Sequence, residues 1–597
     1  MKFGNSVLFK MVPLLFGVQA TACAIEPADD ADTASEQAAI ADNVSAPRDV
    51  IKSVFQEAVR HSPTAAVFAG DRSFDAAMDD LSPAEFASFY SRMAQLESKL
   101  AKIDPTTLSS AERFALDLAL TTAHDAHARD TAKSQLWELN SRSDFGDGLA
   151  SIPRAQVLRS AADLDKLLTR YRKISVALDQ RQANLRSGLA RGLVASNTIV
   201  TRVIGNYRAV GGTAASGSPF ADVAFDPSIS AATQAQWKAK VAAVVDASVA
   251  PAFQRFANFL ENTILPCART SYGYAGLGAL GSNFYVAQVK VQTGSDLTPE
   301  AIHDLGLQRV DEIQAQMISN LDAVGIHEAT LSAGLARLLQ LPESVPATAE
   351  QATTRSAEVL SKLYATAWSG DVWGLPNPPP VTVDVIDQVG SPFYVTGAST
   401  MVIPVGSARQ YELDSMVTHE YTHYLQDLVA TQPGAEPPVS PYLPVFGSVV
   451  LVEGVAHFAE VVALGSTLYD YPDARTTALT KLAGLNGLML RAVRLVVDTG
   501  IHTKGWTHDQ VVAYMTDHLI GTPAFFSFEA DRYASWPGQA LGYRLGVEAM
   551  FSEQARAAAA LGSRFSSSAF NRMALGLSGA TAQLLHQATD ELISSTP

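Results

Sequence analysis

Cysteine is nearly absent from this chain, with only Cys23 and Cys267 among 597 residues. Two cysteines cannot build a disulfide framework. Neither lies near the histidine motif described below, so no thiolate is available there as a metal ligand. Cys267 has no sequence feature that would activate a thiol, and we expect it to be a small core residue rather than a nucleophile.

Positive charge is also in short supply. Lysine and arginine number 44 against 60 aspartates and glutamates, which gives a net charge of −16, and no basic cluster stands out. This balance argues against nucleic acid or an anionic membrane surface as a partner. Hydrophobic residues make up 47% of the chain, which is ample for a sizeable core. The length would suit several domains or one large two-lobed unit.

The apolar stretch at residues 11–18 is too short to predict a stable membrane span. Basic residues precede it and small residues follow it up to Ala22, which predicts a signal peptide over residues 1–23. Cys23 also resembles the end of a degenerate lipobox, so simple cleavage and lipidation both stay open. Residues 24–47 hold six acidic residues and no Lys or Arg, which predicts a disordered acidic linker. We expect export to the periplasm or cell envelope, otherwise secretion, with membrane contact only through a lipid on Cys23.

The most informative stretch is His-Glu-Tyr-Thr-His at residues 419–423, an HExxH motif. Positions i and i+4 share one face of an α-helix, so His419 and His423 would point to the same place. Two neutral imidazoles at that spacing suit a zinc ion. Glu420 would lie beside the ion, where its carboxylate can take a proton from zinc-bound water. Two metal ligands and a general base indicate a hydrolase.

A catalytic zinc usually has a third protein ligand, and Glu453 is the candidate, 30 residues after His423. Glu453, His457 and Glu460 fall on one face of a second predicted helix. We expect His457 and Glu460 to orient the metal ligands from behind. Two alternatives stay open: His457 as the third ligand, and Glu453 as a helix N-terminal charge favoured by the dipole.

The spacing of apolar residues predicts a mainly α-helical protein, because helical runs cover most of residues 48–594. A small β-sheet is expected just before the histidine motif, because residues 381–386, 392–395 and 400–404 have β-like patterns. Such a sheet could offer an edge strand to a peptide substrate, or it could be a plain structural hairpin.

Several motifs together resemble the bacterial family called domain of unknown function 885 (DUF885), whose members look like gluzincin-type zinc metallopeptidases. The similarity spans roughly residue 50 to the C-terminus, and one element is Glu-Gly-Val-Ala-His-Phe-Ala-Glu at 453–460. Many members carry a Pro-Gly insertion within the histidine motif, whereas this chain has plain HExxH spacing. The other matching segments are Asp296–Leu307, Arg494–His502, Gly505–Trp506, Arg532–Tyr533 and Pro537–Tyr543.

The resemblance implies a two-lobed helical fold with a deep central channel, formed here by a metallopeptidase-like domain over residues 48–597. The Arg532–Tyr533 pair is similar to an Arg-Tyr pair in the angiotensin-converting enzyme group, where the tyrosine stabilises the oxyanion. This similarity favours Arg532 as the cation for a substrate carboxylate, although Arg491, Arg494 and Arg544 carry the same charge.

A peptidase also needs donors for the oxyanion, and the phenols of Tyr533 and Tyr543 are candidates. Each could equally be a packed aromatic residue with a satisfied hydroxyl. His502 could bind substrate or oxyanion, with its ring oriented by Asp498 one turn earlier in the helix. The other interpretation of His502 is a supporting or capping histidine.

These observations predict an exported zinc metallohydrolase that cleaves short unfolded peptides through Glu420-activated water. An amidase acting on cell-wall peptide or N-acyl substrates would keep the same zinc site. A non-catalytic envelope binding protein is the other alternative, although a binder has no need of Glu420. The sequence gives neither the oligomeric state nor a choice between exo- and endo-cleavage.

Overall fold

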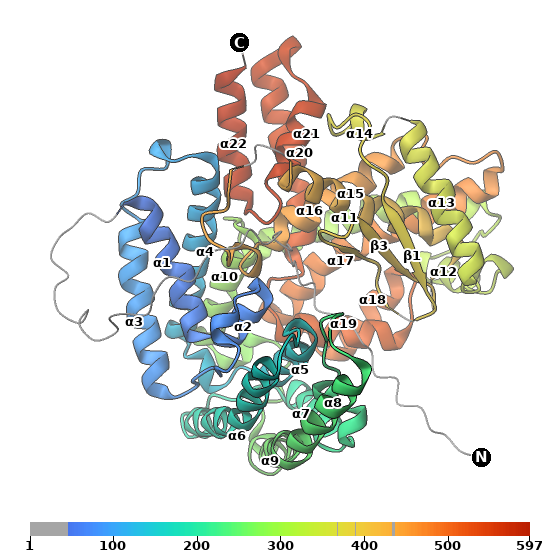
Figure 1. Cartoon of the computed structure of the whole chain (residues 1–597). Helices are drawn as coiled ribbons and strands as arrows, with labels where there is room; N and C mark the ends of the chain where they lie inside the picture. The colour runs from blue at the N-terminus through green and yellow to red at the C-terminus, as the bar shows by residue number, and fades with distance from the viewer. Residues whose placement is uncertain (1–45, 367, 389, 407, 433–435, 597) are drawn as a thin grey trace, which may run out of the picture.

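The computed structural model describes residues 46–366, 368–388, 390–406, 408–432 and 436–596. The predicted signal peptide and nearly all of the predicted linker lie outside these residues. The chain is mainly helical with a small three-stranded sheet, which confirms the predicted fold class at that level (Figure 1). The two-lobed shape, the deep channel and the domain boundaries stay predictions.

The helices of the first half form two groups, the blue helices and the teal-to-green helices of Figure 1. Polar side chains begin many of them: Ser109, for example, accepts a hydrogen bond from the Glu112 N–H at the start of α4. The first group comprises α1 (Pro47–His61), α2 (Pro63–Ala66), α3 (Pro83–Leu100) and α4 (Ser110–Ala132). The second comprises α5 (Phe145–Ala155), α6 (Ala161–Leu189), α7 (Asn197–Gly211), α8 (Ala231–Val244) and α9 (Ala250–Phe259).

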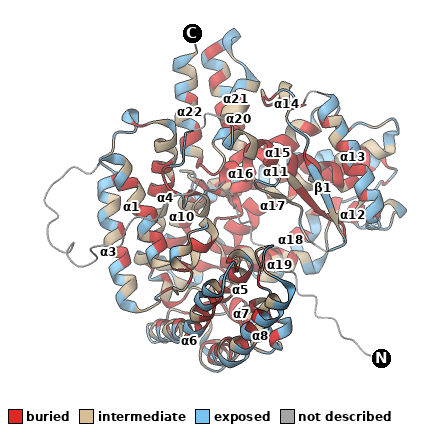
Figure 2. Cartoon of the chain, in the orientation of Figure 1, coloured by how far each residue is buried: buried red, intermediate tan, exposed pale blue. Residues whose placement is uncertain are grey.

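The second half of the chain contains one long helix, α17 (Ala474–Thr503). It is buried along most of its length and packs on α11, α15, α16, α19 and α20, so it is a central support (Figure 2). The other helices that follow α9 in the chain are α10 (Ala279–Thr293), α11 (Pro299–Ala323), α12 (Leu331–Leu338), α13 (Ala349–Ala365), α14 (Trp368–Asp371), α15 (Leu413–Ala430), α16 (Val449–Leu464), α18 (His508–His518), α19 (Pro523–Ser535), α20 (Leu541–Leu561), α21 (Ser567–Gly576) and α22 (Ala582–Ser595).

The predicted sheet is present as β1 (Thr382–Ile386), β2 (Phe393–Val395) and β3 (Thr400–Pro404). The strand order is β1-β3-β2, with β3 parallel to β1 and antiparallel to β2. The middle strand β3 is the most buried and leads through a short 3-10 turn into α15. The sheet therefore anchors the start of the helix that carries the histidine motif. Addition of a peptide strand to its edge stays a prediction.

Helices α16 and α20 cross with their backbones in contact. A Cβ atom added at Gly546 would lie only 2.2 Å from the Val450 carbonyl oxygen, and one at Gly454 would lie 2.6 Å from the Gly546 Cα. Only glycine permits this approach. The crossing fixes α20 against the residue that follows Glu453, and so places α20 beside the candidate metal centre.

Some sequence expectations differ from the structure. The helical runs predicted from apolar spacing leave out residues 131–153, 265–297 and 520–536, so α10, α19 and most of α5 were not predicted. Cys267 is exposed, so its assignment to the core was wrong. None of the helices among the described residues combines the length and apolar character needed to cross a membrane.

Candidate metal centre

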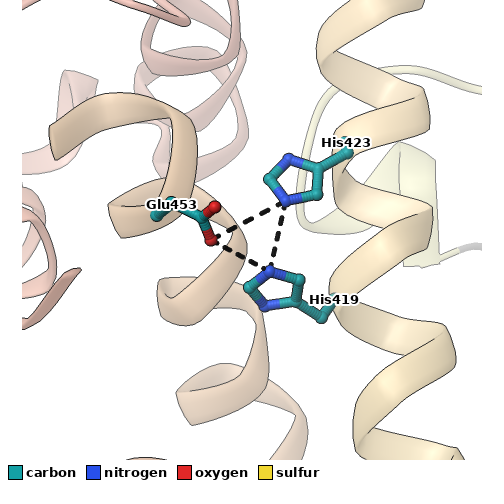
Figure 3. A group of neighbouring side chains, drawn as sticks. All are labelled: His419, His423 and Glu453. Carbon is teal, nitrogen blue, oxygen red and sulfur yellow. Dashed lines mark hydrogen bonds and ion pairs between the residues drawn. The ribbon is translucent and has the colours of Figure 1, made fainter. Parts of the chain in front are cut away.

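Three buried side chains from α15 and α16 converge at one place (Figure 3). His419 and His423 project from one face of α15, and Glu453 projects from the first turns of α16 toward both rings. All three are less than a tenth exposed, at 8%, 8% and 4%. The structure thus brings together the three predicted ligands, and this group could hold a metal ion.

The spacing of the three ligand atoms fits a small dication. The two Nε2 atoms lie 3.2 Å apart, and Glu453 Oε2 lies 3.2 Å from His419 Nε2 and 3.9 Å from His423 Nε2. A triangle with these sides has its centre about 2 Å from every corner, which matches the bond lengths of zinc to imidazole nitrogen and carboxylate oxygen. His457 is outside this group, so the structure favours Glu453 over His457 as the third ligand.

Hydrogen bonds on the far side of each ring orient both histidines. His419 Nδ1 lies 2.6 Å from Glu460 Oε1, and His423 Nδ1 lies 2.8 Å from Gln426 Oε1. Both partners are acceptors, so each Nδ1 carries a proton and each Nε2 points to the shared centre. Gln426 is itself fixed, because its Nε2 donates to the carbonyls of Leu451 and Val452 in α16.

The carboxylates around the centre stabilise one positive charge, which His419 carries. Burial opposes a proton on His419, but its contacts with Glu453 and Glu460 raise its pKa to about 10. Burial and the charge of His419 lower the pKa of His423 to about 4. Despite burial, the contact with His419 lowers the pKa of Glu453 to about 2. A metal cation would supply the same positive charge in place of the His419 proton.

Glu420 has the properties of a general base. It is 3% exposed, and its Oε2 has no hydrogen-bond partner among the described residues. Burial raises its pKa to about 7, the His419 charge opposes this, and repulsion from Glu453 and Glu460 adds to it. A carboxylate with a pKa near neutrality and a free oxygen can accept and return a proton.

Glu460 is held in place by α17. Arg491 Nη2 lies 3.4 Å from Glu460 Oε1, and the Ser415 hydroxyl donates to Oε2. Burial opposes ionisation of Glu460, but Arg491 keeps its pKa well below the ordinary value. Glu460 thus supports His419, as expected. His457 lies 3.6 Å from Glu460, but neither of its ring nitrogens forms a hydrogen bond within the described part of the chain.

The other predicted site residues gather in a second group, which we call the arginine cluster: Arg494, Glu529, Arg532, Tyr533 and Tyr543. Glu529 accepts from Arg494 at 3.1 Å, from Arg532 at 3.2 Å and from the Tyr533 hydroxyl at 2.6 Å. Arg494 Nε also donates to the Tyr533 oxygen. The Tyr533 hydroxyl is therefore engaged both as a donor and as an acceptor. The Tyr543 hydroxyl, in contrast, makes no hydrogen bond to a described residue. Their roles as oxyanion donors stay predictions.

His502 and Asp498 are arranged differently from what we expected. The Tyr274 N–H donates to His502 Nδ1, and His502 Nε2 donates to the Tyr533 carbonyl, so backbone groups occupy both ring nitrogens. Burial lowers the pKa of His502 to about 3. Asp498 instead accepts from the Tyr285 hydroxyl and the Gly538 N–H. Neither nitrogen of His502 is left for a substrate in this structure.

Three supporting residues were missed or misassigned from the sequence. Gln426 follows His423 by three residues, so the helical face offered a signal that could have identified it. Arg491 was considered as a cation for substrate, but it pairs with Glu460. Glu529 had no signal, because the helix that carries it was not predicted.

Comparison with known proteins supports the resemblance to one family. A family model described as "Bacterial protein of unknown function (DUF885)" matches residues 63–588. No curated protein matches the sequence.

Solved structures with the same fold include two described as candidate lipoproteins. The one from Colwellia psychrerythraea is 21% identical with a TM-score of 0.77, covering 92% of this chain and 99% of its own. The one from Shewanella oneidensis, of unknown function, is 15% identical with a TM-score of 0.70, covering 91% and 99%. A Pyrococcus furiosus carboxypeptidase covers 92% and 98% at 9% identity, but its TM-score of 0.37 is too low to support any argument.

Proposed function

The chain belongs to the DUF885 family, and within that family we propose that it is a zinc-dependent peptidase that cleaves short unfolded peptides. One observation carries the proposal. The ligand atoms of His419, His423 and Glu453 surround a point at zinc-ligand distance, and the free carboxylate oxygen of Glu420 belongs to the residue next to His419. A structural metal site would have no use for an unpaired buried carboxylate, which is costly to maintain.

The donor set fits zinc both in its ligand types and in the orientation of the ligand side chains. Two neutral imidazole nitrogens and one carboxylate are a common catalytic zinc set, which leaves a further position open. Glu460 and Gln426 hold a proton on each Nδ1, so both Nε2 atoms already face the centre and a metal ion needs only to displace the second His419 proton. Little reorganisation is needed for binding.

The chain's own groups account for the proton transfers of peptide hydrolysis. A bound zinc ion supplies a Lewis acid that lowers the pKa of water and polarises a carbonyl. Glu420 accepts the proton of the attacking water and passes it to the leaving amine. Its pKa of about 7 suits both steps, because the group can gain and lose a proton near neutral pH.

We also propose that the protein works in the periplasm or cell envelope. The signal-like segment that ends at Cys23 supports this location. The description of two proteins of the same fold as candidate lipoproteins agrees with it.

The test combines metal analysis with peptide digestion. The purified protein should contain about one zinc per chain, and mass spectrometry should show cleavage of a peptide mixture. Glu420→Gln should retain the metal and lower kcat by about 10²- to 10⁴-fold, the usual contribution of a general acid–base group. Retained metal shows that the folded centre has survived.

Two outcomes would reject the proposal. One is full activity of Glu420→Gln, because the chemistry would then not need this carboxylate. The other is a metal-loaded wild-type protein that releases no product from any peptide. Cleavage confined to cell-wall peptides or N-acyl amino acids would identify an amidase with the same centre.

A further inference from the structure

The arginine cluster carries more positive than negative charge. Arg494 and Arg532 both pair with Glu529, and neither pairs with another carboxylate within the described ranges. The three side chains are only 8%, 11% and 4% exposed. Two guanidinium groups, which stay charged at any working pH, thus share a single buried carboxylate. Excess buried charge is unfavourable, so the cluster can bind one more anion.

Hydrogen-bond donors remain for such an anion. Arg494 Nη1 and Arg532 Nε donate to none of the described residues, although the Nη2 atom of each is engaged. The Tyr543 ring lies 4.4 Å from the Arg494 guanidinium carbon and 5.9 Å from that of Arg532. The ring thus contacts one arginine closely and lies near the other, and its hydroxyl is a further unused donor. Guanidinium N–H groups match the geometry of a carboxylate.

Two helices connect the arginine cluster to the metal centre. Arg494 follows Arg491 by three residues, about 4.5 Å along the axis of α17, and Arg491 contacts the Glu460 that supports His419. On the other side, α20 carries Tyr543 and touches α16 at Gly546 and Gly454, next to Glu453. Two of the cluster's helices, α17 and α20, therefore pack directly against helices that hold the metal ligands.

We propose that Arg494 and Arg532 bind a carboxylate of the substrate beside the metal centre. This inference rests on the proposed peptidase function and names its substrate class: peptides with a carboxylate near the cleaved bond. The carboxylate can be the free C-terminus or an acidic side chain. In the first case the enzyme removes residues from the C-terminal end of a peptide.

The test compares two libraries of hexapeptides with the same sequences, one with free C-termini and one with C-terminal amides. Products are identified by mass spectrometry with the wild-type, zinc-loaded protein. We expect kcat/KM for the free acids to exceed that for the amides by about 10- to 100-fold, the value of a charge-assisted hydrogen bond pair. Cleavage of amides only beside Asp or Glu would identify the side-chain carboxylate as the ligand.

Variants connect the preference to the cluster. Arg532→Gln should lower kcat/KM for the free acids more than for the amides and so abolish the preference, and Arg532→Lys should retain part of the preference because the charge remains. The control is Arg202→Gln, which removes a half-exposed arginine paired with Asp531 in the same helix as Arg532. It should leave the preference unchanged.

Failure of this inference differs from failure of the proposed function. Equal cleavage of both libraries regardless of acidic residues, or an equal loss for all substrates in Arg532→Gln, would overturn the carboxylate site and leave the peptidase intact. Absence of cleavage in both libraries would reject the peptidase. Calorimetry then tests the carboxylate site independently of cleavage, by measuring peptide affinity. Zinc-loaded Glu420→Gln should bind acetyl-tetraalanine about 10-fold or more tightly than the corresponding amide. Equal affinity for the two peptides would overturn the inference.

Discussion

The metal centre and the arginine cluster are both buried groups of charged side chains held by helices, but they satisfy those charges in opposite ways. At the metal centre the ligand atoms face a common point, where a cation can take the place of the His419 proton. In the arginine cluster the charges bind one another directly around Glu529. The first group is therefore completed by a cation and the second by an anion.

The comparison also separates two uses of a buried carboxylate. Glu529 accepts hydrogen bonds from three side chains, whereas Glu420 Oε2 accepts none from a described residue. Accordingly the pKa of Glu529 falls to about 2, despite burial, because Arg532 and Arg494 stabilise its charge, and the pKa of Glu420 rises to about 7. The same side chain is a structural ion in one place and a proton acceptor in the other.

Removal of the Glu529 charge should have the largest effect on stability. Glu529→Gln leaves two buried guanidinium groups without a counter-ion, and we expect the free energy of unfolding to fall by about 3–5 kcal/mol. Chemical denaturation measures this change. Glu453→Gln is the matched variant at the metal centre and should lose bound zinc. If the metal-free forms of both variants are equally destabilised, the proposed contrast between the regions is wrong.

Acidification should remove the stability that the ionised Glu529 side chain contributes. The pKa of Glu529 is about 2 in the folded protein and near the ordinary 4.5 when unfolded, so its stabilisation is complete above pH 4.5 and is lost as the pH falls toward 2. The stability gap between wild type and Glu529→Gln should shrink over that window by up to about 3 kcal/mol. Urea titrations at several pH values measure the gap. A gap that stays constant between pH 5 and 3 would show that Glu529 is not ionised by these arginines.

The two regions also differ in how far sequence could predict them. The ligands His419 and His423 are four residues apart on one helix, so helical geometry alone placed them together, and Glu453 and Glu460 followed from a similar face on the next helix. The arginine cluster joins α17, α19 and α20, and Arg494 meets Glu529 across 35 residues. No local periodicity encodes that contact. Sequence therefore predicted the three converging side chains and the sheet, but it expected Asp498 to orient His502 and gave no role for Glu529.

Loss of a ring-orienting group should have a smaller effect than loss of a buried charge. Gln426→Ala removes the acceptor that fixes His423 Nδ1, and we expect zinc affinity to fall by about 10- to 100-fold. Competition with a zinc chelator measures the affinity. Gln426→Glu keeps an acceptor and should retain most of it. Unchanged affinity in Gln426→Ala would mean that packing alone holds the His423 ring in place.

The smallest expected effect comes from a half-exposed arginine next to the arginine cluster. Arg202 is half-exposed and lies 2.6 Å from Asp531, which also accepts from the Tyr272 hydroxyl. Arg202→Gln should cost only about 0.2–1 kcal/mol of unfolding free energy, because water screens the pair and Tyr272 still satisfies Asp531. Chemical denaturation of Arg202→Gln and Glu529→Gln under the same conditions measures both losses of unfolding free energy. A loss as large as that of Glu529→Gln would show that burial of the arginine side chains does not set the difference, and the comparison between the regions would lose its physical basis.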